Sequence, residues 1–297
     1  MGSETFRFPL GKFSCVAIRD NGFRYPLAMF LTNLPRETYQ PLLRERGEDL
    51  EQVDLPYTCM LIETGRERVL IDTGIGRDGA GPEPGRLLPL LRAEGVAPEE
   101  IDTVILSHAH TDHIGGNLTE EGNPAFPHAV YVMFQKEWDF WTSSPSLAEL
   151  PVDADFKRKM LASVRNNVFP IRGQLDLLQR ETEILPGISA IAAFGHSPGH
   201  MAVQISSEGQ RLLFVADALI HPLNLPYPET RGVTDHDPEE MLATRLRLLE
   251  KAAREKCLVA TSHFQFPGLG YVKPKGDRWD WEPVRVSAHP GVVPTSG

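Results

Sequence analysis

The sequence VILSHAHTDH, residues 104–113, sets the architecture we expect: a short apolar run leads directly into three histidines and an aspartate. Only 10 of the 297 residues are histidine, so the pattern has a small risk of arising by chance. Imidazole nitrogens and carboxylate oxygens are the ligands that zinc favours. A solvated histidine-rich loop is the alternative explanation. We interpret the stretch as a strand that ends in a metal-binding loop.

Four further candidate ligands also lie where an apolar run ends. His196 and His200 follow ISAIAAFG, Asp217 ends RLLFVAD, and His263 ends CLVATSH. Strand ends gather at one edge of a layered sheet structure, so residues remote in sequence can meet there. For Asp217 alone, a helix cap or turn is the competing explanation. We expect these segments to converge on the loop at 108–113.

The surrounding sequence predicts alternating strands and helices. Residues 57–74 form two apolar runs around a Thr-Gly-Arg turn, which indicates a β-hairpin. A leucine-rich helix at 81–96 and a strand at 101–106 follow, giving the order β-β-α-β. Asp237 and Pro238 fit the N-cap and first position of a long surface helix. We therefore expect one domain over 1–297, with an N-terminal extension (1–50), a helical insertion (134–170) and a C-terminal tail (274–297).

The motifs H-A-H-T-D-H and G-H-S-P-G-H, followed by the lone Asp217 and His263, together resemble the metallo-β-lactamase superfamily. The likeness covers roughly residues 57–272, and the order of the motifs matches as well. Residues 1–50 carry no family signature. The resemblance implies an α/β (α+β) fold: a four-layer αββα sandwich of two mixed β-sheets flanked by helices.

The resemblance also implies a role for each motif residue. The first metal would be held by His108, His110 and His200, the second by Asp112, His113 and His263, with Asp217 bridging both. Two others resemble supporting residues that are not ligands, His196 and Asp72, although Asp72 in LIDTG equally fits a turn in the core. Two divalent ions are therefore expected. Zinc is the first expectation, and manganese, cobalt or iron also suit mixed His/Asp ligands.

A narrower likeness is to methyl parathion hydrolases and N-acyl homoserine lactonases. It is carried by EWDFW (137–141), by the helix after TDHDPEE (234–240) and by SHFQFPGLGYV (262–272). It implies a small lactone or ester as substrate. Aromatic side chains of the insertion could line its entrance or simply hold the insertion on the core: Trp138, Phe140 and Trp141. His221, four residues past Asp217, would border the pocket, but residues 221–224 depart from the family and leave the substrate open.

The expected chemistry needs no protein nucleophile. Two divalent ions about 3.5 to 4 Å apart can share a water, present it as hydroxide and polarise the bond to be broken. Asp112 is the candidate catalytic residue, orienting that hydroxide or moving its proton. The sequence contains no G-x-S-x-G elbow and no cysteine near the ligand motifs, so covalent catalysis has no support.

Other functions remain as alternatives of different weight. The main alternative to a lactonase or esterase is a phosphotriesterase, followed by a thioester hydrolase, a β-lactamase and a non-catalytic metal-binding protein. The formal charge of −10 disfavours nucleic acid as a partner. A di-iron redox role is disfavoured because His110 stands where such relatives carry a carboxylate.

Three scattered cysteines and no signal-like or membrane-spanning run lead us to expect a cytoplasmic protein without a membrane partner. The oligomeric state is open, a homodimer included.

Overall fold

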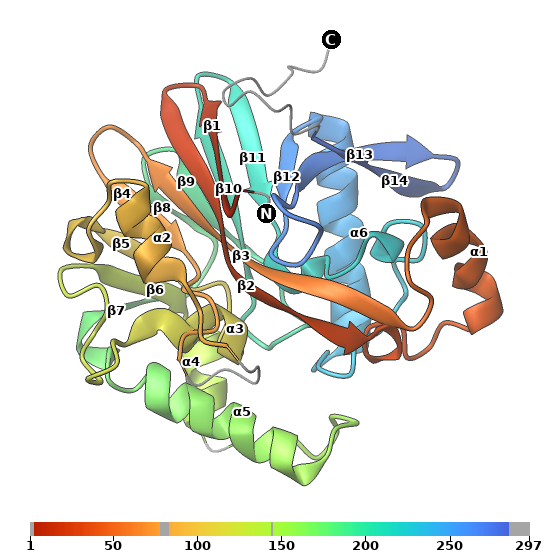
Figure 1. The fold of residues 1–297 in the computed structure, drawn as a ribbon, viewed down its shortest axis with the longest axis horizontal. Helices are drawn as coiled ribbons and strands as arrows, with labels where there is room; N and C mark the ends of the chain where they lie inside the picture. Colours follow the sequence, from red (N-terminus) through yellow and green to blue (C-terminus); the bar gives the residue numbers. More distant parts are fainter. Residues whose placement is uncertain (1–2, 78–82, 144, 285–297) are drawn as a thin grey trace.

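The strands form two seven-stranded sheets that pack face to face (Figure 1). The computed structural model describes residues 3–77, 83–143 and 145–284. The first sheet has the order β1 (Thr5–Leu10), β2 (Phe13–Pro26), β3 (Gln52–Glu63), β4 (Arg68–Ile71), β5 (Thr103–Ile105), β6 (Val130–Phe134), β7 (Leu175–Leu178). The second has the order β14 (Arg278–Pro283), β13 (Leu269–Lys275), β12 (Leu258–Ala260), β11 (Gln210–Phe214), β10 (Met201–Ser207), β9 (Ile188–Ala192), β8 (Thr182–Leu185). Both sheets are mixed, because β4 to β7 run parallel, as do β11 and β12.

Alternation along the strands explains why both faces of each sheet are buried. In β3, Met60 and Ile62 point into the core shared by the two sheets, whereas Cys59 and Leu61 point to the opposite face. Side chains in a strand alternate with a period of two, so a strand covered on both sides is apolar throughout. The same division appears in β11, where Leu212 faces the other sheet and Leu213 faces a helix. The sequences of these two strands thus require a second layer outside each sheet.

Helices provide those outer layers. The outer face of the first sheet is covered by α2 (Leu87–Ala93), α3 (Thr111–Ile114), α4 (Gln135–Thr142) and α5 (Ala154–Asn167). The second sheet is covered by α6 (Pro238–Glu255), and α1 (Arg36–Arg46) packs in a separate cluster that contains Leu223. Short 3₁₀ turns complete the chain: η1 (Leu27–Met29), η2 (Pro98–Glu100), η3 (Gly115–Asn117), η4 (Arg172–Gln174), η5 (Ala216–Ala218) and η6 (Pro222–Asn224). The expected αββα sandwich is confirmed.

Most of the expected elements lie where the sequence placed them. The hairpin is β3 paired with β4, and the Asp237 carboxylate accepts from Glu239 N and Glu240 N at the start of α6. The stretch expected as an N-terminal extension contributes β1 and β2 to the first sheet, and the stretch expected as a C-terminal tail contributes β14 to the second. Residues 285–297 of that tail, and residues 81–82 of the expected helix, lie outside the described residues.

The strand ends of both sheets meet along one edge. Met201 N at the start of β10 donates to Ser107 O, which follows β5, at 2.7 Å. This bond ties the loop after a strand of the first sheet to the beginning of a strand in the second. Segments that follow β4, β5, β9, β11 and β12 therefore reach the same region.

A buried carboxylate shapes the loop beside this edge. Asp20 in β2 is fully buried, and its two oxygens accept from Ile75 N at 2.8 Å and Leu87 N at 2.7 Å. Gly74 and Gly85 let the chain wrap around it, because a Cβ at either position would lie 2.3 or 2.5 Å from the carboxylate. Asp20 thus fixes the path of the loop after β4.

Burial raises the pKa of Asp20 to about 6 from 3.8, so the folded chain holds this proton more tightly than the unfolded chain. The protonated Asp20 side chain therefore stabilises the fold below pH 3.8, and this contribution is lost as pH rises through about 6. In the native protein, this group should lower the free energy of unfolding by roughly 3 kcal/mol as pH rises from 3.8 to about 6. In Asp20→Asn, we expect this fall to be absent. Denaturant titrations across that range measure it. The exposed Asp176→Asn is the control, and an unchanged pH slope in Asp20→Asn would contradict the prediction.

Candidate metal centre

Four loops deliver the candidate ligands to the shared edge. The loop after β5 carries His108, His110, Asp112 and His113, and the loops after β9, β11 and β12 carry the others. Asp112 and His113 lie in the short helix α3, whose first turn follows directly from the loop. The expectation that strand ends would converge is therefore confirmed at the level of the fold.

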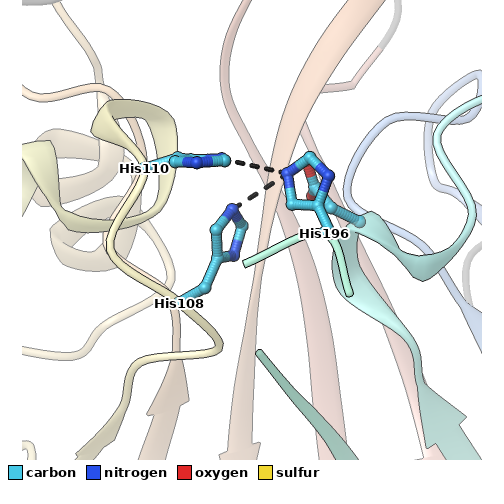
Figure 2. Close-up of side chains that lie close together, drawn as sticks. His108, His110 and His196 are labelled. Atoms are coloured by element: carbon cyan, nitrogen blue, oxygen red, sulfur yellow. Dashed lines mark hydrogen bonds and ion pairs between the residues drawn. The ribbon is translucent and has the colours of Figure 1, made fainter. Parts of the chain in front are cut away.

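One group of side chains could hold a first ion. It consists of His108, His110, His196 and Asp217, whose donor atoms all lie within 4.8 Å of one another. The three imidazoles approach from loops of both sheets (Figure 2). His196 Nε2 is 2.9 Å from His110 Nδ1 and 3.2 Å from Asp217 Oδ2. A nitrogen-rich set with one carboxylate suits zinc and similar divalent ions.

A second group lies beside the first, and Asp217 faces both. Asp112, His113 and His263 form this group, again with donor atoms within 4.8 Å of one another. Asp217 Oδ1 lies 3.1 Å from His113 Nε2 and 3.0 Å from His263 Nε2, while Oδ2 is directed to His196 in the first group. One carboxylate oxygen thus serves each group, which is the arrangement expected of a bridging ligand.

The structure places His196, and not His200, within the closely grouped donors. The sequence-based interpretation placed His200 in the first set and His196 behind it, but His196 is the residue whose ring lies with the other donors. His200 Nε2 instead accepts from Asp217 N at 3.1 Å, so its ring supports the backbone of that residue. His196 therefore joins the candidate ligands, while His200, whose Nδ1 is buried without a partner among the described residues, stays the ligand predicted from the sequence until the two variants are compared.

Three hydrogen bonds orient the rings from behind. Asp72 Oδ2 accepts from His113 Nδ1 at 2.7 Å, Asp235 Oδ1 accepts from His196 Nδ1 at 2.8 Å, and Pro56 O accepts from His263 Nδ1 at 2.9 Å. A carboxylate or carbonyl behind a histidine fixes its tautomer and leaves the other nitrogen free for a metal. Asp72 was expected in this role, whereas Asp235 was missed, although it lies in the TDHDPEE segment that was singled out.

The donors fit a pair of cations. His108 Nε2, His113 Nε2 and Asp217 Oδ1 are buried without a hydrogen-bond partner among the described residues, although Asp217 Oδ1 is close to His113. Leaving buried polar atoms unpaired costs free energy, and native proteins rarely do so without a function at that place. Since the unpaired atoms all face the same two groups, a bound cation would satisfy them together.

Comparison with known proteins agrees with this geometry. The sequence model of the metallo-β-lactamase superfamily matches residues 53–263. The chain belongs to the metallo-β-lactamase superfamily. An N-acyl homoserine lactonase of Bacillus thuringiensis is 25% identical, over 71% of this chain and 82% of the relative. The N-acyl homoserine lactonase AiiB of Agrobacterium fabrum is 29% identical, over 80% of this chain and 84% of the relative. The structure of AidC, a dizinc quorum-quenching lactonase in complex with a product, superposes with a TM-score of 0.90 at 26% identity, covering 96% of this chain and 99% of that one.

In this metallo-β-lactamase superfamily chain, the electrostatics of the site couple cation binding to the loss of protons. Burial alone would raise the pKa of Asp217, but His263, His113 and His196 outweigh it and hold that pKa well below its ordinary range. Burial opposes the charge of His196 as well, yet Asp217 and Asp235 raise its pKa to about 9. Metal ligands must be deprotonated, so binding at this site should release protons.

Backbone strain accompanies two of the site residues of this superfamily member. Ala216, which precedes Asp217, has φ 42°, and Asp72 has φ 60°. Positive φ costs a residue other than glycine free energy, and it persists where surrounding contacts fix the conformation. Here the strain places a carboxylate against the histidines on both sides of the site.

A small apolar cavity of about 10 Å³, with room for about one water molecule, adjoins the first group. His110 and His196 form its inner end, and the insertion supplies most of its apolar lining: Phe140, Trp141, Leu147, Leu150 and Met160. Among the aromatic residues expected at a substrate entrance, Phe140 and Trp141 lie here, while Trp138 packs on Phe169. His221 lies elsewhere, with Nε2 3.8 Å from Glu48 and Nδ1 accepting from Leu223 N. His236 was missed, and it lines the cavity beside Phe140.

No helix within the described residues is both long and apolar enough to cross a membrane.

Proposed function

We propose that this hydrolase opens the ring of a lactone that carries an apolar acyl substituent. The observation that carries the proposal is the direct contact between the apolar cavity and the candidate metal ligands His110 and His196. A substrate bound here would direct its apolar acyl group towards these side chains, which would have to move apart to admit it, and its ester group towards the donors. The curated relatives and the AidC structure, all described as lactonases, support this substrate class.

Two divalent ions, with zinc as the first candidate from the ligand types, would be held in two sets that share a carboxylate. The first set is His108, His110, His196 and Asp217, and the second is Asp112, His113, His263 and Asp217. When bound, such a pair supplies a water with a pKa lowered towards neutrality and polarises the ester carbonyl.

Within the second set, Asp112 has the side chain that solvent can reach. Its side chain is 21% exposed, whereas those of His113 and His263 are almost fully buried. Asp112 Oδ2 lies 3.6 Å from Nε2 of both histidines, so its other oxygen remains available. We infer that Asp112 orients the attacking water and takes up its proton, because a carboxylate at this place can reach both water and solvent.

A substrate panel tests the proposed function. Metal-loaded protein is assayed with N-acyl lactones, unsubstituted lactones, aryl esters, thioesters and phosphotriesters, and again after treatment with a chelator. We expect N-acyl lactones to give the highest kcat/KM and the chelator to abolish turnover. A phosphotriester ranked first would overturn the substrate class. A metal-loaded protein inert towards the whole panel would overturn the activity itself.

The cavity predicts a dependence on acyl chain length. Trp141 is 6% exposed and also borders a second hollow lined by Thr142, Leu161, Arg165 and Phe169. Removing the indole in Trp141→Ala should lengthen the inner cavity, and we expect kcat/KM for long acyl chains relative to short ones to rise roughly tenfold or more. Steady-state kinetics over a chain-length series measure this ratio.

Two variants control for that experiment. Trp138→Ala removes an indole of the same helix that packs on Phe169, away from the cavity lining, and should leave the ratio unchanged. Trp141→Phe keeps an aromatic wall but loses the Nε1 hydrogen bond to Glu137. The same chain-length profile in native protein and Trp141→Ala would show that the acyl group binds elsewhere.

A further inference from the structure

Glu137 is a charged side chain buried at 0% exposure, and the proposed chemistry does not use it. It lies in the first turn of α4, and both carboxylate oxygens are fully engaged. Oε1 accepts from Ala109 N at 2.9 Å and Trp141 Nε1 at 2.8 Å, and Oε2 accepts from Ser197 Oγ and Gly199 N, each at 2.7 Å. Burying a carboxylate is expensive unless it is paired and hydrogen-bonded, so four donors on one group indicate a specific role.

The four donors belong to three different parts of the candidate site. Ala109 stands between His108 and His110 in the loop of the first sheet, and Ser197 directly follows His196 in the loop of the second. Trp141 forms a wall of the apolar cavity. One carboxylate therefore connects both ligand-bearing loops and the wall of the cavity.

Close backbone packing adds to these bonds. A Cβ at Gly199 would lie 2.2 Å from Glu137 N and 2.6 Å from its Cα, so any larger residue would force the loop away from α4. Gly199, the second glycine of the G-H-S-P-G-H motif, is thus required for this close approach of the loop to α4. The second loop is held against Glu137 by a steric fit as well as by hydrogen bonds.

The two loops need such a support when an ion is bound. In this structure, His110 Nδ1 and His196 Nε2 are hydrogen-bonded to each other at 2.9 Å, which itself holds the loops together. An ion that uses either of these nitrogens replaces that bond, and the separation of the loops must then be fixed by other contacts. Glu137 provides contacts to both loops that do not involve the ligand nitrogens.

We propose that Glu137 is a positioning residue that sets the distance between the loops bearing His110 and His196, and so tunes the affinity of the first metal site. The inference rests on the proposed metal centre, but it does not depend on which substrate is hydrolysed. Among the described residues, Glu137 accepts no hydrogen bond from the second set, Asp112, His113 and His263. The effect should therefore be larger at the first site, although Asp112 and His113 follow Ala109 in the same loop.

The test compares Glu137→Gln with native protein by zinc titration against a chromophoric chelator, which resolves two dissociation constants. Gln has the shape of Glu, but its amide group would face donors where the carboxylate accepts. We expect one constant to rise roughly 10- to 100-fold, the range known for residues that support metal ligands, and the other to rise by a clearly smaller factor. Glu149→Gln, an exposed residue of the same insertion, is the matched control and should change neither constant.

Further variants separate positioning from a merely structural role. Ser197→Ala removes a single donor and should weaken the same site by a smaller factor, which keeps the test available if Glu137→Gln folds poorly. Both constants unchanged in Glu137→Gln, or both raised equally, would overturn the inference. Native protein that binds no zinc would instead overturn the metal centre, so the two failures are distinguishable.

Discussion

A chain carrying His196→Ala should bind one divalent ion where the native chain binds two, and its kcat/KM should fall by roughly a thousandfold. His196 Nε2 is a donor of the first group, oriented by Asp235 and 3.2 Å from Asp217. Without it, that group keeps two imidazoles and a shared carboxylate, which is one ligand fewer than a stable site needs. Metal content after dialysis and steady-state kinetics on the best lactone measure the two effects.

His200→Ala is the comparison that decides between the two histidines of the G-H-S-P-G-H motif. It removes the acceptor for Asp217 N and leaves a buried N–H unpaired. We therefore expect two bound ions, a loss of about 1–3 kcal/mol in stability and a smaller loss of activity. The reverse pattern, with the ion lost in His200→Ala and retained in His196→Ala, would restore the assignment made from the sequence.

The positions of most candidate ligands were predictable because they depend on a short-range pattern. An apolar run of strand length followed at once by a polar side chain identifies the end of a buried strand, and such ends meet at one edge of a sheet. His108, Asp217 and His263 all follow this rule, and the structure brings all three together. The αββα layering was expected from the resemblance to the metallo-β-lactamase superfamily, and the structure is consistent with it, since strands apolar on both faces need covering on both sides.

The grouping of His196 with the other donors could not be predicted, because it depends on contacts from distant parts of the chain. Both histidines lie in one loop, four residues apart, and either could face the cation. The deciding contact is the carboxylate of Asp235, 39 residues beyond His196, which orients its ring. Spacing within a motif says nothing about a partner that only the fold brings close.

The burial of Glu137 could not be predicted from the sequence for a related reason. Within EWDFW it resembles a solvated acid at the start of an amphipathic helix, where a negative charge is favourable in any case. Its burial follows from the packing of α4 against two loops that belong to different sheets. Strand β2 was likewise missed, since no motif marks it, although it pairs with β3 along nearly its whole length.

The largest effect on metal binding is expected for Asp217→Asn, which should weaken both ions together. Asp217 Oδ1 faces His113 and His263, and Oδ2 faces His196, so its single negative charge serves both groups. Asparagine keeps the shape, but it is neutral and replaces one of the two acceptor oxygens with a donor. We expect each dissociation constant to rise at least roughly 100-fold and kcat/KM to fall by on the order of a thousandfold or more.

Asp112→Asn makes the comparison specific, because Asp112 belongs to the second group alone. It should weaken one zinc site in the chelator titration, whereas Asp217→Asn should weaken two. If Asp217→Asn changed only one constant, the carboxylate would be a terminal ligand, and the two ions would share no protein group. Shared ligation also has a functional consequence, since a charge held by both ions keeps them close enough to act on one water and one carbonyl. Loss of both ions in Asp217→Asn would therefore support the bridging carboxylate as the group on which the paired site depends.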